Sequence, residues 1–405
     1  MTDAAVSEVQ EFGPDYFQDP LGFFARVREE GPVVPVHLPD GGQYWVITRY
    51  ADVRAALADP RLHKDYVRKL AGPDWQPDPM TMFLNVHMLA ADPPDHTRLR
   101  KLVTRAFTAR RIAGLRPRIE AITSSLLDAM EDSARAGADQ ADLIEAFAFP
   151  LPVTVICELL GVPARDQEDF KHWSHAILSS IGSQAEGLAA GTAMYHYFND
   201  LIAVKRRSPA DDLISALVDA RDSDDSLDER ELMAMLFLLL VAGHETTANL
   251  IATGTLSLLA NPAELARLRS EPALLPGAVE ELLRYSNPLN HATERFTTEP
   301  TEIGGVTIPA RAWVLCATSS ANRDPGRFAD PDRLDLGRDA SGHVAFGHGI
   351  HYCLGAPLAR LEGEIAFGAL LSRFPGLSLA VDPATLRWRP SSLIHGLETL
   401  PVRLG

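Results

Sequence analysis

The chain has 405 residues, of which 46% are hydrophobic and 23% are charged, with 28 Gly and 29 Pro. These fractions are ordinary for a globular protein and exclude a disordered, fibrous or collagen-like chain. The 38 Lys and Arg against 54 Asp and Glu give a net charge of −16, which opposes general binding to nucleic acid or to an anionic membrane. Three cysteines in so long a chain supply no disulfide framework, so we expect a reducing, cytoplasmic compartment.

The first twenty residues contain no apolar core segment, so neither a signal peptide nor a transit peptide is expected. The strongest apolar stretch covers residues 236–260, and His244 and Glu245 interrupt it after eight residues. A membrane span needs about 20 consecutive apolar residues. This stretch is therefore predicted to be a helix buried in protein, with a polar break that needs an explanation.

Helical patterns dominate the chain, with short strands near both ends. Asp19-Pro20 has the residues of an N-cap and a first turn, and predicts a helix that ends at Gly31-Pro32. The segments on either side of Asp40-Gly41-Gly42 predict a β-hairpin. Residues 60–90 are predicted to form a long connection rich in proline, methionine and aromatic residues, and loops of that length are usually functional or mobile.

From about residue 96 to residue 286 the pattern is helical. The longest helix is predicted to open at a capping box, Ser226-x-x-Glu229, and to reach Asn261-Pro262, a length of roughly 50 Å. Short strands are expected at 293–299, 302–309 and 312–320, then a helix at about 355–373 and two closing strands. No linker or repeat marks a boundary, so we expect one domain over residues 1–405, mainly α with a minor β-sheet region.

The segment from Phe346 to Gly355 carries the strongest chemical signal. Cys353 stands at the end of a glycine-rich loop and just before a helical pattern. Backbone N–H groups of such a loop and of a helix N-terminus stabilise a thiolate, and a thiolate is a strong axial donor to iron. The glycines at 347, 349 and 355 would let the backbone approach a large flat ligand.

The other cysteines, Cys157 in an apolar helical pattern and Cys316 in a strand pattern, are expected to be structural. A zinc site built from Cys353 and the histidines at 343, 348 and 351 is a further interpretation. Zinc loops usually present pairs of ligands at close, regular spacing, and this set has none.

The polar break lies at Ala242–Thr247, inside the long apolar helix. Glycine in a helix interior lowers helix stability by about 1 kcal/mol relative to alanine, so a packing or functional role is expected for Gly243. The Thr246 hydroxyl can bond the carbonyl of residue 242, and Glu245 in apolar surroundings suits a proton donor or relay. A helix with one satisfied polar turn is the structural alternative. A zinc-protease HExxH motif fails, because Ala248 stands where its second histidine should be.

Three further groups of charges stand out. Glu281 and Arg284 are neighbours on a leucine-rich helix, although such pairs are common. His96 and Arg100 share a helix face, and form either a solvated basic face or a site for one anion. Residues 98–118 contain eight Lys or Arg and no acid, which favours an acidic electron-transfer partner over nucleic acid, with an arginine-rich solvated helix as the alternative.

The pattern Phe346-x-x-Gly349-x-x-x-Cys353-x-Gly355 resembles the haem-binding signature of the cytochrome P450 superfamily, which are haem-thiolate monooxygenases. The resemblance makes Cys353 the proximal iron ligand. Residues 242–247 resemble the family's oxygen-binding motif, with O₂ beside Ala242-Gly243 and with Glu245 and Thr246 delivering protons. Glu281 and Arg284 resemble its ExxR element, which supports the cysteine loop. The implied fold is a triangular, helix-rich domain with haem b buried between the long central helix and the helix after the cysteine loop.

The same resemblance assigns the haem propionates to His96, Arg100, Arg295 and His351. The acidic pair usual after that strand arginine is here Glu299-Pro300, which departs from the family pattern. Because no flavin or nicotinamide fingerprint is evident, the NAD(P)H-derived electrons are expected to come through a ferredoxin reductase and a ferredoxin. A monomer is expected.

The implied activity is hydroxylation or epoxidation of an apolar small molecule, and similar bacterial enzymes often oxidise macrolides, terpenoids or other secondary metabolites. Apolar residues spread over four segments are predicted to line the substrate pocket: Val86, Leu89, Leu240, Val241, Leu289, Leu393 and Ile394. Two alternatives remain: a peroxygenase that takes its oxygen from H₂O₂, which an intact Glu245-Thr246 pair disfavours, and a non-catalytic haem protein that senses or carries a ligand.

Overall fold

The structure is a computed structural model that describes residues 10–38, 41–66, 69, 79–178, 184–221 and 227–405. Its contacts group the chain into two compact units. The first unit comprises Met1–His63, Thr123–Ala148 and Asn249–Gly405, and the second comprises Lys64–Ile122 and Phe149–Ala248. The single domain over residues 1–405 stays a prediction.

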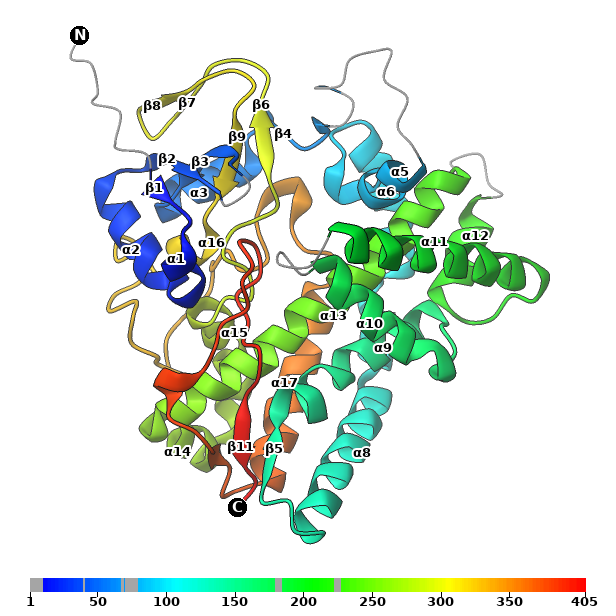
Figure 1. The fold of residues 1–405 in the computed structure, drawn as a ribbon, viewed down its shortest axis with the longest axis vertical. Coiled ribbons are helices and arrows are strands. Elements are labelled where there is room, and N and C mark those ends of the chain that lie inside the picture. Colours follow the sequence, from blue (N-terminus) through cyan, green and yellow to red (C-terminus); the bar gives the residue numbers. More distant parts are fainter. Residues whose placement is uncertain (1–9, 39–40, 67–68, 70–78, 179–183, 222–226) are drawn as a thin grey trace. The chain divides into compact units, whose positions relative to one another are not determined.

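The first unit contains a mixed six-stranded sheet in the order β1-β2-β3-β9-β6-β4 (Figure 1). Its strands are β1 (Gln10–Glu11), β2 (Val33–His37), β3 (Gln43–Ile47), β4 (Leu62–His63), β6 (Arg295–Thr297) and β9 (Trp313–Cys316). The predicted hairpin is confirmed, because β2 and β3 pair antiparallel from Val33 opposite Ile47 to His37 opposite Gln43. Alternate residues face opposite sides of a strand, so Val34 and Val36 enter one hydrophobic cluster and Val33 enters another.

The described part of the first unit also contains two smaller sheets and seven α-helices that lie wholly within it, besides short 3₁₀ and π-helical turns. The small sheets are β10-β11-β5, made of Ser378–Leu379, Pro401–Arg403 and Gln140–Asp142, and the hairpin β7 (Thr301–Ile303) and β8 (Val306–Ile308). The helices are α1 (Pro14–Gln18), α2 (Pro20–Glu30), α3 (Tyr50–Ala58), α14 (Pro262–Ser270), α15 (Leu275–Tyr285), α16 (Thr318–Asn322) and α17 (Ala356–Arg373). Asp19 caps α2 as predicted, with the Gly22 N–H donating to its Oδ1 at 2.9 Å.

The described residues of the second unit form helices and the turns that connect them, and contain no strand. Its helices are α5 (Pro79–Asn85), α6 (Asp95–Ala106), α7 (Ala109–Gly114), α9 (Pro150–Leu160), α10 (Gln167–Leu178), α11 (Gln184–Arg207) and α12 (Leu213–Arg221), with a 3₁₀ turn η1 at Met88–Ala90. Two helices continue from one unit into the other: α8 (Arg116–Arg135) and α13 (Glu229–Ala260). The helix-rich class with a minor sheet region is confirmed.

Helix α13 is the predicted long helix, but its cap lies two residues later than expected. The Glu231 N–H donates to Asp228 Oδ1 at 2.8 Å, and the Asp228 N–H donates to Glu231 Oε2 at 3.0 Å, which is a reciprocal capping box. The predicted cap, Ser226, lies outside the described residues. By length and composition α13 could cross a membrane, with a mean hydropathy of 1.4, but 83% of its most apolar window is buried, as in the core helix of a globular protein.

Two other expectations need correction. The connection predicted over 60–90 contains helix α5 and the turn η1, and the Phe83 ring lies 5.4 Å from the ring of Tyr195 and 4.9 Å from that of Phe237. Phe83, which was predicted to lie in a loop, is therefore a core residue of a helix. Residues 70–78 lie outside the described part of the chain. The strand predicted over 312–320 ends at Cys316, and α16 follows, with the Ala321 N–H bonded to the Ala317 carbonyl at 3.0 Å.

Candidate active site

Cys353 lies in the first unit, between a 3₁₀ turn η5 (Gly349–His351) and helix α17. Its N–H donates to the Phe346 carbonyl at 2.9 Å and closes the loop, and its own carbonyl accepts from the Ala356 N–H at 3.4 Å. The Cys353 side chain is exposed. The loop therefore holds an accessible thiol just before a helix N-terminus, a position that stabilises a thiolate.

The backbone conformation and packing of this loop require glycine at two positions, in addition to the predicted close approach of a ligand. Gly347 and Gly349 have φ of 71° and 75°, a region that other residues seldom adopt. A Cβ on Gly349 would lie 3.1 Å from Ala58 Cα and from the Leu57 carbonyl, so the loop also needs this glycine to pack on α3.

The other two cysteines are buried, in agreement with a structural role. Burial in α9, with a smaller contribution from Glu158, raises the pKa of the Cys157 thiol to about 12. Cys316 is buried in β9. Among the described residues no group of three or more His, Cys, Asp or Glu could hold a metal ion, which disfavours the zinc interpretation.

Arg295 is a buried cation in strand β6, with 4% of its surface exposed. Its Nε is buried and has no hydrogen-bond partner among the residues that the structure describes. A buried guanidinium in that state fits an anionic ligand, since leaving it unpaired is costly. His351, half-buried in η5, stands two residues before Cys353.

Glu281 and Arg284 form a fully buried ion pair on α15, with both side chains at 0% exposure. Glu281 accepts from Arg284 Nε at 2.7 Å and from Nη2 at 2.8 Å, and Arg284 Nη1 donates to the carbonyls of Asn322 and Pro331 at 2.9 and 2.8 Å. Glu281 also accepts from Arg338 Nε at 3.2 Å, a partner that the sequence did not identify because it lies 57 residues away.

The ExxR pair reaches the cysteine loop through two intermediate residues, Asn322 and Val344. Asn322, whose carbonyl binds Arg284, accepts the N–H of Val344 on its Oδ1 at 2.7 Å. Val344 in turn accepts the Gly347 N–H at 2.9 Å. The pair thus supports the start of the loop rather than Cys353 itself.

Glu280, beside Glu281, was also not identified from the sequence. Its carboxylate accepts hydrogen bonds from Arg360 on α17 and from His343 before the cysteine loop. Burial alone would raise the pKa of Glu280, but these hydrogen bonds outweigh burial and lower it to about 2. Adjacent carboxylates of α15 therefore hold different segments around the loop.

The second unit contains the polar break of α13. The Thr246 hydroxyl donates to the Ala242 carbonyl at 3.3 Å, as predicted. A Cβ on Gly243 would lie 2.9 Å from Ile156 Cδ1 of α9, so close packing explains this glycine. Ala242 is exposed and Thr246 is half-buried within an otherwise buried helix. Side chains on this face of α13 are therefore accessible.

Glu245 is 1% exposed and follows His244, which is 0% exposed. His244 Nδ1 contacts the Leu240 carbonyl at 2.8 Å, which makes Nδ1 the protonated nitrogen. His244 Nε2 lies 4.0 Å from Glu245 Oε2, too far for a direct hydrogen bond. The Glu245 carboxyl group is therefore held inside the second unit beside the buried ring of His244.

His96 and Arg100 lie four residues apart on α6. Burial, and to a smaller extent the neighbouring Arg100, lower the pKa of His96. Arg98 of the same helix instead pairs with Glu231, its Nη1 lying 3.1 Å from Oε2. Of these three basic residues of α6, Arg98 is therefore neutralised by an ion pair within the second unit, and His96 and Arg100 remain as the candidate site for an anion.

The predicted substrate residues fall into two groups. In the first unit Leu289 and Ile394 form an isolated β-bridge, and the Asn290 N–H donates to the Leu393 carbonyl at 2.8 Å, which brings 289, 393 and 394 together. In the second unit Leu240 and Val241 are buried in α13, and Val86 and Leu89 are half-buried before and within η1.

Comparison with known proteins identifies the family. A family model described as cytochrome P450 matches residues 189–385. The chain is 52% identical over 417 residues to cytochrome P450 107B1 of Saccharopolyspora erythraea, with 100% of both chains covered. The chain belongs to the cytochrome P450 family. Its P450 fold is supported by the solved structure of the P450 monooxygenase TamI with bound tirandamycin C, which matches with a TM-score of 0.89 at 52% identity, covering 98% of this chain and 100% of that one.

A second relative of the P450 is 6-deoxyerythronolide B hydroxylase of Saccharopolyspora erythraea, 43% identical over 413 residues with 100% of both chains covered. The protein is a cytochrome P450 monooxygenase, and the family implies a haem cofactor. The exposed Cys353 thiol and the buried Arg295 Nε fit the iron and an anionic group of haem.

A first prediction concerns the buried ion pair of the P450. Glu281→Gln should lower the free energy of unfolding by about 3–5 kcal/mol, because it leaves the buried Arg284 charge without its counter-charge. Glu120→Gln is the matched control, since Glu120 pairs with Arg116 at 3.6 Å on an exposed surface. That change should cost less than about 1 kcal/mol. Urea unfolding of both variants measures the difference, and equal effects would contradict a structural role for Glu281.

Proposed function

We propose that this P450 hydroxylates or epoxidises an apolar secondary metabolite, with electrons from NAD(P)H delivered by a ferredoxin reductase and a ferredoxin. The observation that carries the proposal is an exposed Cys353 on a loop closed by the Phe346 carbonyl. The relatives of the chain include 6-deoxyerythronolide B hydroxylase. When bound, haem supplies the activation of O₂, and thiolate ligation favours O–O cleavage.

The residues proposed to hold the haem are those that the family resemblance assigns to it. Cys353 would bind the iron, and Phe346, Gly349 and Gly355 shape the loop around it. Arg295 and His351, with His96 and Arg100 on α6, would bind the propionates, since arginine is well suited to carboxylates. The orphaned Arg295 Nε supports this assignment most directly.

Proton delivery is proposed for Glu245 and Thr246. Glu245 is enclosed by protein, so a proton that it holds is shielded from bulk solvent. The Thr246 hydroxyl donates to the Ala242 carbonyl, which leaves its oxygen able to accept a hydrogen bond from water. Retention of both residues favours an O₂-dependent monooxygenase over a peroxygenase.

The substrate is proposed to be a polyketide-like or terpenoid-like molecule with a largely apolar surface. All the proposed pocket residues are leucine, isoleucine or valine, and each of them is buried or half-buried. Relatives described as acting on or binding 6-deoxyerythronolide B and tirandamycin C support this class.

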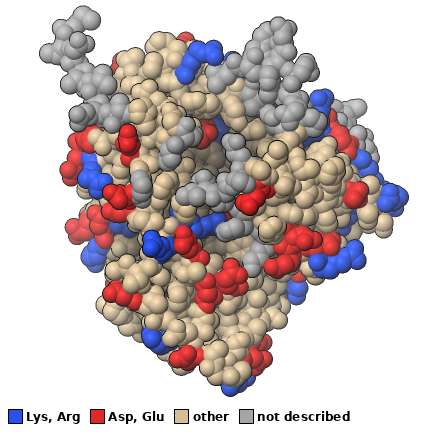
Figure 2. Space-filling view, in the orientation of Figure 1, with Lys and Arg blue, Asp and Glu red and all other residues tan. Residues whose placement is uncertain are grey.

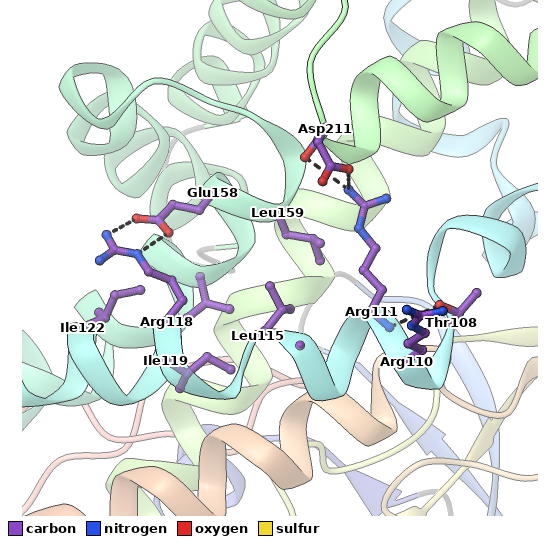
Figure 3. Close-up of a pocket in the computed structure, with 12 residues that line it drawn as sticks. Thr108, Arg110, Arg111, Leu115, Arg118, Ile119, Ile122, Glu158, Leu159 and Asp211 are labelled. Atoms are coloured by element: carbon purple, nitrogen blue, oxygen red, sulfur yellow. Dashed lines mark hydrogen bonds and ion pairs between the residues drawn. The ribbon is translucent and has the colours of Figure 1, made fainter.

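An acidic ferredoxin is proposed to dock on residues 98–118. A groove of about 490 Å³ lies there, lined by Arg110, Arg111 and Arg118 together with Leu115 and apolar side chains of α8 and α9. Figure 3 shows these residues. Arg111 lies 3.5 Å from Asp211 and Arg118 lies 2.6 Å from Glu158, so this surface is less positive than the sequence indicates. The groove contains none of the proposed haem or substrate residues. Figure 2 shows acidic and basic side chains interspersed over the face that it displays.

The iron ligand gives a second prediction. Cys353→Ser should abolish the far-red-shifted Soret band of the reduced carbon monoxide complex, because serine cannot supply a thiolate. Cys157→Ser and Cys316→Ser should keep the band, since both thiols are buried in regular elements outside the loop sequence. Loss of the band in Cys316→Ser alone would overturn the assignment.

A third prediction tests Thr246. Thr246→Ala removes the hydroxyl and improves helix propensity by several tenths of a kcal/mol, so haem content and substrate binding should survive. NADPH consumption should continue while product falls and H₂O₂ rises, because protons are no longer directed to the reaction. Thr255→Ala, a buried threonine of the same helix, is the control and should stay coupled. A coupled Thr246→Ala variant would assign proton delivery to Glu245 or to solvent.

A fourth prediction concerns the docking surface. Electron transfer from an acidic ferredoxin should slow as ionic strength rises, and Arg110→Glu should weaken ferredoxin binding up to about fivefold without changing substrate affinity. Arg207→Glu, an exposed arginine on α11, makes the same charge change elsewhere and should have less effect. The Arg105 side chain, also predicted to take part, lies outside the described residues. Salt-independent reduction would count against this surface.

A further inference from the structure

Arg360 is held by a two-point ion pair next to the cysteine loop. It lies on α17, and its Nε and Nη2 donate to Glu280 Oε1 and Oε2 at 2.6 and 2.9 Å. Such a bidentate pair fixes the plane and the direction of the guanidinium group. Both residues belong to the first unit, as does Cys353.

The fixed guanidinium contacts the loop on both sides of its closing hydrogen bond. The Arg360 guanidinium carbon lies 4.6 Å from the centre of the Phe346 ring, within the range of a cation–π contact. Arg360 Nη1 donates to the Tyr352 hydroxyl at 3.3 Å. Phe346 accepts the Cys353 N–H, and Tyr352 directly precedes Cys353. Arg360 thus contacts both Phe346, which binds the Cys353 N–H, and Tyr352, which precedes Cys353 in the chain.

Glu280 also holds the start of the loop. His343 Nδ1 accepts the Ala345 N–H at 3.1 Å, so the ring proton is on Nε2, which donates to Glu280 Oε2 at 3.1 Å. Glu280 therefore joins α15 to α17 through Arg360 and to the loop through His343. This network is separate from the Glu281–Arg284 pair, which reaches the loop through Asn322.

We propose that Arg360, fixed by Glu280, is a positioning residue that keeps the Cys353 sulfur in ligating geometry and whose positive charge raises the haem reduction potential. This inference rests on the proposed ligation of iron by Cys353. A nearby positive charge favours the reduced state, which carries one more electron, and a nearby negative charge disfavours it. Removing the charge of Arg360 and removing that of Glu280 should therefore shift the potential in opposite directions.

The experiment compares the haem-loaded variants Arg360→Gln, Arg360→Lys and Glu280→Gln. Arg373→Gln is the matched control, because Arg373 lies on the same helix, is 31% exposed against 33% for Arg360, and pairs with Asp128 and Glu131 at 2.6 and 2.8 Å. Two quantities are measured: the ferric/ferrous potential, and the rate at which the reduced carbon monoxide complex loses its thiolate band in mild urea.

Arg360→Gln should lower the potential and speed loss of the thiolate band by roughly fivefold, the effect of one well-formed, partly exposed ion pair. Arg360→Lys should keep the potential closer to that of the parent but lose the band faster, because lysine retains the charge without the planar contact. Glu280→Gln should raise the potential. Arg373→Gln should leave both quantities unchanged.

Two failures are distinguishable. A parent protein without a thiolate band would contradict ligation by Cys353, and with it the proposed function. A parent with the band, together with an Arg360→Gln variant that behaves like Arg373→Gln, would overturn the role of Arg360 alone. Shifts of the potential with the same sign in Arg360→Gln and Glu280→Gln would also overturn it. If Arg360→Gln holds no haem, the potential of Glu280→Gln and the rate of band loss in Arg360→Lys still test the proposal.

Discussion

The Glu281–Arg284 pair imposes a constraint that much of the first unit must satisfy. Both charges are fully buried, so every hydrogen-bonding atom needs a partner in the protein. Those partners are Asn322, the last residue of α16, and Pro331, Asp335 and Arg338, on the irregular chain between α16 and the cysteine loop. A segment with little regular structure of its own is thereby given a defined path, and the cysteine loop begins where that path ends.

The long helix α13 meets a different demand. Most of this helix is apolar and packs in the protein interior, but residues 242–246 introduce small and polar side chains. Gly243 admits Ile156, and Thr246 bonds the carbonyl four residues before it, so these two departures from the apolar pattern are each matched locally. The helix can therefore carry polar groups at its centre without losing its backbone hydrogen bonding.

The sequence predicted the features whose signals are local. The cap of α2, the β2–β3 hairpin, the helix after Cys353 and the Thr246 hydrogen bond all depend on residues within a few positions of one another. It did not reveal Arg338 as a partner of Glu281 or Arg360 as a partner of Glu280, because those contacts cross 57 and 80 residues. Helix α5 was missed for another reason: flanking prolines and methionines obscured a short helix that tertiary packing of Phe83 stabilises.

The unequal accessibility of the three cysteines has a consequence for handling the protein. Cys157 and Cys316 are buried, and the raised pKa of Cys157 keeps it in the unreactive thiol form. In apoprotein, oxidants and alkylating reagents would therefore reach Cys353 first, the thiol that the enzyme needs. Newly synthesised chain is thus vulnerable to oxidative inactivation until the prosthetic group is inserted, and a maleimide pulse would report the fraction of a preparation that has not matured.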